Sequence, residues 1–136
     1  MIVEEDKLLR DALVLFFRTK GARVRSFNSG EEAVPEMQVL RPDIVISDRS
    51  LPGMDGLEFL RQIGARYPEA VRILIDAYPD APFADEARGA GIDECLPKPL
   101  SIEEVERAMG RWFRTRSGGG NRPGGPDGRQ DNEMAG

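Results

Sequence analysis

The side chains of this chain that could do chemistry together are acids and one lysine, each directly after a short apolar run. Asp48 ends one such run, and two acids, Glu4 and Glu5, follow another. Asp76 follows a third run, and Lys98 lies just after a fourth. The 136 residues include no histidine, which excludes a Ser-His-Asp or Cys-His mechanism and any histidine-ligated metal. Any chemistry must therefore use carboxylates, lysine, hydroxyls and the backbone.

Acids that end neighbouring strands repel one another. Two unit charges about 5 Å apart cost on the order of 3 kcal/mol at an effective dielectric constant of about 20. A hard divalent cation with oxygen ligands relieves this repulsion, which suits Mg²⁺ or, as a substitute, Mn²⁺. A cation of this kind and a lysine that faces it are also the groups that position and neutralise a phosphoryl group during its transfer. Asp48 would then be the nucleophile that forms an acyl phosphate, and Lys98 would pair with the phosphoryl oxygens.

The elements that position these residues alternate between strand and helix. Short apolar runs predict strands, and apolar residues at three- and four-residue spacing predict helices. Five strand–helix alternations predict a flavodoxin-like, doubly wound parallel sheet of order 2-1-3-4-5 with helices on both faces. Strands 1 and 3 are then adjacent, and their carboxyl ends form the crevice where such sheets bind ligands. The predicted strands are 2–3, 23–27, 43–47, 71–75 and 92–96, and the predicted helices are 6–20, 29–40, 57–67, 83–90 and 101–116.

Composition limits the class of protein. The length predicts one domain over residues 1–116, and the Gly- and Pro-rich residues 117–136 are predicted to be a disordered tail or linker. A net charge of -5 does not favour nucleic-acid contact, and the longest apolar run is too short for a membrane span. The acidic start has no signal-peptide pattern, and a single cysteine, Cys95, cannot form an internal disulfide. These features favour the cytoplasm.

Several segments together resemble the receiver domain of two-component response regulators, from Met1 to about Arg116. The segments are Glu4-Glu5 with Arg10, Pro42-Asp43 to Asp48, Leu51-Pro52-Gly53-Met54-Asp55-Gly56, and Pro97-Lys98-Pro99. The resemblance implies a cytoplasmic phosphoprotein of a phosphorelay. Such a domain is no enzyme beyond its own phosphorylation and autodephosphorylation. Its partners would be a histidine kinase or a histidine phosphotransfer protein, and possible dimers would form through the fourth helix, fifth strand and fifth helix.

The same resemblance implies a role for each site residue. Asp48 would accept a phosphoryl group from a phosphohistidine donor, and Lys98 would bind the phosphoryl group. Mg²⁺ would be held by Glu5, Asp48 and the backbone carbonyl of Ser50, with Glu4 in the outer shell. The peptide bond between Lys98 and Pro99 would be cis.

Three departures from the family pattern raise a second hypothesis. The acid pair is Glu-Glu, where the family usually has Asp-Asp or Glu-Asp. Asp76 replaces the switch hydroxyl, and it is expected to repel a phosphoryl group because an ionised carboxylate cannot donate a hydrogen bond. Cys95 replaces the switch aromatic and is interpreted as an inert buried residue. Arg49 directly follows Asp48 and could lean toward a phosphoryl group, but the favoured interpretation is a solvated residue at the start of the loop.

The alternative is therefore a degenerate receiver that acts as a phosphorylation-independent protein-interaction module. A flavin carrier of similar fold is disfavoured, because the acids at residues 4–6 would repel a flavin phosphate.

Overall fold

A computed structural model describes residues 1–77 and 80–117, with side chains as far as Trp112. Strands and helices alternate through this part of the chain, as the sequence predicts. None of the helices described there is long and apolar enough to cross a membrane. The elements are β1 (Ile2–Val3), α1 (Lys7–Thr19), β2 (Ser26–Phe27), α2 (Gly30–Ala33), the 3₁₀ helix η1 (Val34–Gln38), β3 (Ile44–Asp48), α3 (Gly56–Arg66), β4 (Val71–Asp76), α4 (Ala81–Gly89), β5 (Glu94–Pro97) and α5 (Ile102–Ser117).

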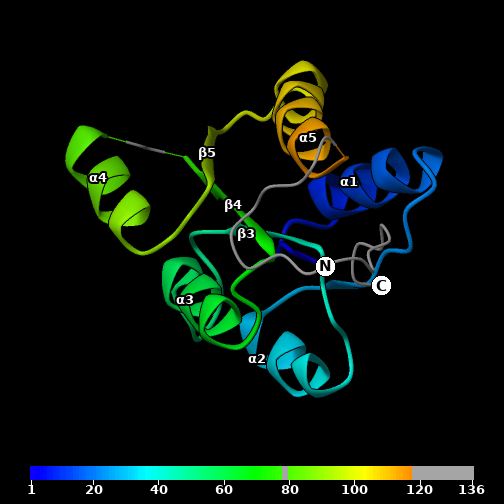
Figure 1. The fold of residues 1–136 in the computed structure, drawn as a ribbon. Coiled ribbons are helices and arrows are strands. Elements are labelled where there is room, and N and C mark those ends of the chain that lie inside the picture. The colour runs from blue at the N-terminus through cyan, green and yellow to red at the C-terminus, as the bar shows by residue number, and fades with distance from the viewer. Residues whose placement is uncertain (78–79, 118–136) are drawn as a thin grey trace.

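The five strands form one parallel sheet in the order β2-β1-β3-β4-β5, which confirms the predicted topology. Helices α1 and α5 lie on one side of this sheet, and α2, α3 and α4 lie on the other (Figure 1). Each side has its own apolar core, because both faces of a parallel sheet are covered by its crossover helices. Phe17 and Ile46 belong to the core under α1 and α5, and Phe59 and Leu74 belong to the core under α2, α3 and α4.

Three predicted boundaries were wrong. The helix expected over residues 29–40 stops at Ala33 and continues as the 3₁₀ helix, since Pro35 cannot supply the N–H that an α-helix needs inside its ladder. The second strand is only Ser26–Phe27. The fifth strand begins at Glu94, because Ile92 still donates its N–H to Ala87 at the end of α4.

Two predicted helix starts are confirmed by their caps. Ser29 Oγ accepts a hydrogen bond from the N–H of Glu32 at 3.1 Å, and Ser101 Oγ accepts one from the N–H of Glu104 at 3.1 Å. Side-chain caps of this kind satisfy N–H groups that have no partner inside the helix. The predicted tail lies outside the described residues from 118 on and stays a prediction.

Candidate functional site

Asp48 lies buried at the carboxyl end of β3, and both of its carboxylate oxygens accept hydrogen bonds. Asp48 is only 5% exposed. Oδ1 accepts from the backbone N–H of Ser50 at 3.1 Å, and Oδ2 accepts from Nζ of Lys98 at 2.6 Å. The predicted acceptor and the predicted lysine are therefore in direct contact, although 50 residues separate them in the chain.

The register of the sheet brings Glu4 to Asp48 and leaves Glu5 outside. Ile2 pairs with Ile46, so the parallel register continues from Glu4 towards Asp48. Glu4 is 1% exposed, and its Oε2 lies 3.7 Å from Nζ of Lys98. The side chain of Glu5 is exposed. The acid that the sequence analysis assigned to the outer shell is thus the one placed beside Asp48 and Lys98.

The turn that carries these acids is fixed by hydrogen bonds from its neighbours. The N–H of Asp6 donates to Oε2 of Glu4 at 3.0 Å. The Asp6 carboxylate caps α1 by accepting from the N–H groups of Leu8 and Leu9. Nη1 of Arg10 donates to the backbone carbonyls of both Glu4 and Glu5. The start of α1 and the acid turn therefore form one bonded unit next to Asp48.

Burial changes how the charges of this cluster behave. Burial, supported by the nearby charge of Asp48, outweighs the hydrogen bond from Asp6 and raises the pKa of Glu4 to about 7. The pKa of Lys98 is also raised: burial lowers it, but the hydrogen bond to Asp48 and the charges of Glu4 and Asp48 outweigh that effect. Lys98 therefore stays a cation between two acids at neutral pH.

One oxygen of this cluster has no hydrogen-bond partner among the described residues. Oε1 of Glu4 is buried and has no hydrogen-bond partner within the described part of the chain. A buried carboxylate oxygen left in this way costs free energy unless water or a cation reaches it. Among the described residues, no group of three acids or cysteines lies close enough to hold a metal ion unaided. Any cation here would need ligands beyond two carboxylates.

Asp76 lies at the end of β4, and its carboxylate forms an ion pair with Arg49. Its Oδ2 accepts a hydrogen bond from Nη1 of Arg49 at 2.9 Å. The guanidinium carbon of Arg49 lies 3.6 Å from the centroid of the Phe83 ring on α4. The interpretation of Arg49 as a solvated loop residue was therefore wrong.

The other predicted switch position, Cys95, is half-buried at β5 and pairs in register with Leu74. Burial, together with the charges of Asp76 and Glu94, raises the pKa of its thiol. The thiol therefore stays neutral at physiological pH. The cis peptide bond expected between Lys98 and Pro99 is confirmed.

Two glycines shape the loop after β3, and one of them packs on the backbone of Asp48. Gly53 has φ of +77°, a left-handed conformation that side chains disfavour. A Cβ at Gly56 would lie 1.9 Å from the carbonyl oxygen of Asp48 and 2.8 Å from Cα of Arg49. The start of α3 therefore packs directly on the backbone of the candidate acceptor.

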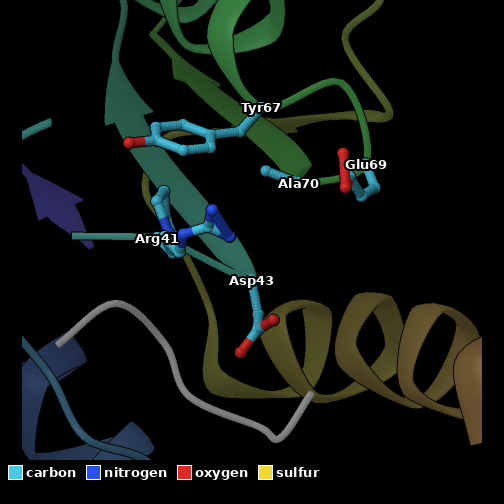
Figure 2. Close-up of a pocket in the computed structure, with 6 residues that line it drawn as sticks. Arg41, Asp43, Tyr67, Glu69 and Ala70 are labelled. Carbon is cyan, nitrogen blue, oxygen red and sulfur yellow. The ribbon is translucent and has the colours of Figure 1, made fainter. Parts of the chain in front are cut away.

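A small hollow lies at the amino ends of β3 and β4, at the end of the sheet away from Asp48. Figure 2 shows Tyr67, Glu69 and Ala70, which precede β4, on one side of Arg41. The side chain of Asp43, which precedes β3, points away from them. The volume of the hollow, about 40 Å³, admits water but no substrate-sized molecule. The sequence analysis did not single it out, and its size gives it no role in the chemistry of the Asp48 cluster.

Comparison with known proteins is consistent with the geometry. The family model for the response regulator receiver domain matches residues 1–109. The transcriptional regulator NtrC of Klebsiella pneumoniae is 35% identical over 115 residues, which are 82% of this chain and 24% of NtrC. A cyclic di-GMP phosphodiesterase of Thermotoga maritima is 30% identical over 116 residues, 85% of this chain and 31% of that protein. This chain thus spans about a quarter to a third of these relatives.

Solved structures share the fold. A CheY-like receiver domain protein from Methanospirillum hungatei superposes with a TM-score of 0.80 at 19% identity, and the match covers 88% of this chain and 95% of that one. The DrrB receiver domain activated with BeF3 has a TM-score of 0.74 at 25% identity, over 83% of this chain and 94% of that one.

Proposed function

This chain is a receiver domain of the response regulator family, and we propose that Asp48 accepts a phosphoryl group from a phosphohistidine on a partner protein. The observation that carries the proposal is the buried Asp48 carboxylate with Lys98 Nζ 2.6 Å from its Oδ2. A cation at this distance stabilises the ionised nucleophile, and it lies beside the charge that a phosphoryl group would bring.

The proposed transfer conserves atoms and charge. An Asp48 carboxylate oxygen attacks the phosphorus atom, and a P–O bond forms. The P–N bond of the phosphohistidine breaks, and its electron pair returns to the imidazole nitrogen, which then takes up a proton. Asp48 ends as an acyl phosphate, and water later hydrolyses this bond and restores the carboxylate. Lys98 pairs with the phosphoryl oxygens throughout, because catalysis of this kind is mostly positioning and charge neutralisation.

Mg²⁺ suits the donor set of this site. Glu4 offers a buried carboxylate oxygen without a partner among the described residues, and it lies beside the Asp48–Lys98 pair. Mg²⁺ is usually held by one or two carboxylates with waters and phosphate oxygens, so the site needs no third acid. We propose Asp48, the Ser50 carbonyl and an acid of the Glu4–Glu5 pair as its ligands, with Glu4 favoured over the exposed Glu5. When bound, the ion would neutralise charge on the phosphoryl oxygens.

A surface suited to the phosphodonor protein lies next to the site. Leu8 and Leu15 on α1 are 82% and 64% exposed and stand seven residues apart, so they share one face of the helix. Helix α1 begins directly after the acid turn. We propose that a histidine kinase or a histidine phosphotransfer protein docks on this face and presents its phosphohistidine to Asp48.

Intact-mass measurement tests the proposal. Incubation with acetyl phosphate and Mg²⁺ should add one phosphoryl group to the wild-type chain and none to an Asp48→Asn variant. Chelation of the metal should abolish the gain. Phosphorylation of the wild type and Asp48→Asn to the same extent contradicts the assignment of Asp48.

A phosphorylation-independent interaction module is the second candidate. The observation that favours it is the Arg49–Asp76 ion pair, which occupies the switch position without any phosphoryl group. A folded wild-type chain that gains no phosphoryl group in the same experiment, while the Asp76→Thr variant gains one, supports this candidate.

A further inference from the structure

Arg49 directly follows the candidate acceptor in the chain, and its side chain is held at two points. Nη1 donates to Oδ2 of Asp76 at 2.9 Å, and the guanidinium stacks on Phe83 with its carbon 3.6 Å from the ring centroid. The Asp76 side chain is 7% exposed, while that of Arg49 is 37% exposed. Part of the Arg49 side chain therefore remains open to solvent.

The backbone of Arg49 is anchored on both sides. Its N–H donates to the carbonyl of Ile75 at 2.8 Å, and its carbonyl accepts from the N–H of Gly56 at 2.8 Å. The first bond ties Arg49 to β4, and the second ties it to the start of α3. Since Arg49 directly follows Asp48, its guanidinium can move only by side-chain rotation about a base fixed next to the acceptor.

We propose that Arg49 is a second cationic phosphoryl-binding residue, and that Asp76 holds it in place until Asp48 is phosphorylated. This inference rests on the proposed function of Asp48. An acyl phosphate carries up to two negative charges, against one on Asp76, so it competes strongly for the guanidinium. The guanidinium of Arg49 has five N–H donors in a planar fork, so some of them can bind phosphoryl oxygens while others stay bonded to Asp76.

This arrangement accounts for the missing switch hydroxyl. A serine or threonine at position 76 would donate a hydrogen bond to the phosphoryl group, and an ionised Asp76 cannot. Arg49 supplies donors at the same edge of the sheet, because Asp48 pairs with Ile75 and Arg49 therefore lies level with Asp76. Asp76 then serves to position the arginine. Phe83 brings the guanidinium into contact with α4.

The deciding experiment separates direct binding from simple shielding of Asp76. If Arg49 only neutralises Asp76, then Arg49→Gln should matter only while Asp76 is charged. We would therefore compare Asp76→Asn with the double variant Arg49→Gln/Asp76→Asn. Rates of phosphorylation by acetyl phosphate with Mg²⁺ would be measured by intact mass, and affinity for beryllofluoride by calorimetry.

Direct binding predicts that the double variant is phosphorylated about 10- to 100-fold more slowly than Asp76→Asn and binds beryllofluoride correspondingly more weakly. Equal rates and affinities for the two variants overturn the proposal while leaving Asp48 as acceptor. If neither the wild type nor Asp76→Asn gains a phosphoryl group, the proposed function fails, and this inference fails with it. The two failures are therefore distinguishable.

Matched variants control for charge and folding. Arg61→Gln removes the same charge from the exposed face of α3, where Arg61 contacts Glu58 at 3.6 Å, and it should leave both readouts unchanged. Urea unfolding checks that each variant is folded. If Arg49→Gln does not fold, Arg49→Lys replaces it, since lysine keeps the charge but loses the planar fork. A loss of about threefold or more then supports direct binding, and no loss overturns it.

Discussion

Replacing Glu4 with glutamine should stabilise the protein at alkaline pH and have far less effect at acidic pH. Burial raises the pKa of Glu4 from 4.5 to about 7, so the folded state binds a proton more tightly than the unfolded state does. The stability associated with protonated Glu4 is fully present below pH 4.5 and is lost as the pH rises through 7. Glutamine keeps the shape of the protonated acid and does not ionise.

The expected size follows from the same values. A rise from 4.5 to about 7, at about 1.4 kcal/mol per pKa unit, corresponds to about 3 kcal/mol. The free energy of unfolding of Glu4→Gln relative to wild type should therefore increase by roughly 2 to 3 kcal/mol between pH 4.5 and pH 8. Urea unfolding at the two pH values, followed by circular dichroism in metal-free buffer, measures this difference.

The comparison with wild type isolates Glu4 from other titrating groups. The buried amino group of Met1, whose pKa burial lowers to about 4, titrates in the same range but is common to both chains. Glu5→Gln is the matched control, since the Glu5 side chain is exposed, and it should change the unfolding free energy by less than about 0.5 kcal/mol at either pH. A difference between Glu4→Gln and wild type that does not vary with pH refutes the reasoning.

Three further experiments test other contacts. In urea unfolding, Gly56→Ala should destabilise the fold by about 3 kcal/mol, because its Cβ would meet the Asp48 carbonyl oxygen. Gly89→Ala, with open space around it, should be neutral or slightly stabilising. Equal effects of the two substitutions would contradict the packing argument. A double-mutant cycle of Arg49→Gln and Asp76→Asn should give a coupling free energy of about 1 to 2 kcal/mol in urea unfolding, and additive effects would rule out an energetically significant ion pair. Lys98→Met should slow phosphorylation by acetyl phosphate about 100-fold or more in intact-mass time courses, and an unchanged rate would remove the lysine from the site.

The sheet order and the position of Asp48 were predictable from the sequence because they depend on local patterns. Short apolar runs followed by acids locate strand ends, and the parallel topology then brings those ends to one edge. Because Asp48 and Lys98 both follow strands that end at this edge, the sequence predicted that they lie close together. Helix starts at Ser29 and Ser101 were predictable for the same reason, since a cap depends on residues only three positions apart.

The roles of Glu4 and Arg49 depend on strand register, which the sequence analysis did not use. Side chains alternate between the two faces of a strand, so the pairing of Ile2 with Ile46 places Glu4, and not Glu5, on the side of Asp48. The pairing of Asp48 with Ile75 likewise places Arg49 level with Asp76. Because these strands are buried on both faces, their residues do not alternate between apolar and polar, and no local signal in the sequence indicates either pairing. The ring of Phe83 against Arg49 depends on how α4 packs and likewise has no local signal.

Locating the phosphorylated residue tests the central claim most directly. After incubation with acetyl phosphate and Mg²⁺, borohydride converts an acyl phosphate on aspartate to homoserine, and peptide sequencing by mass spectrometry locates the converted position. Our account predicts homoserine at position 48, with Asp76 and the acids at positions 4 and 5 unmodified. Conversion at any of those other acids, or a folded wild-type chain with no conversion, would contradict it.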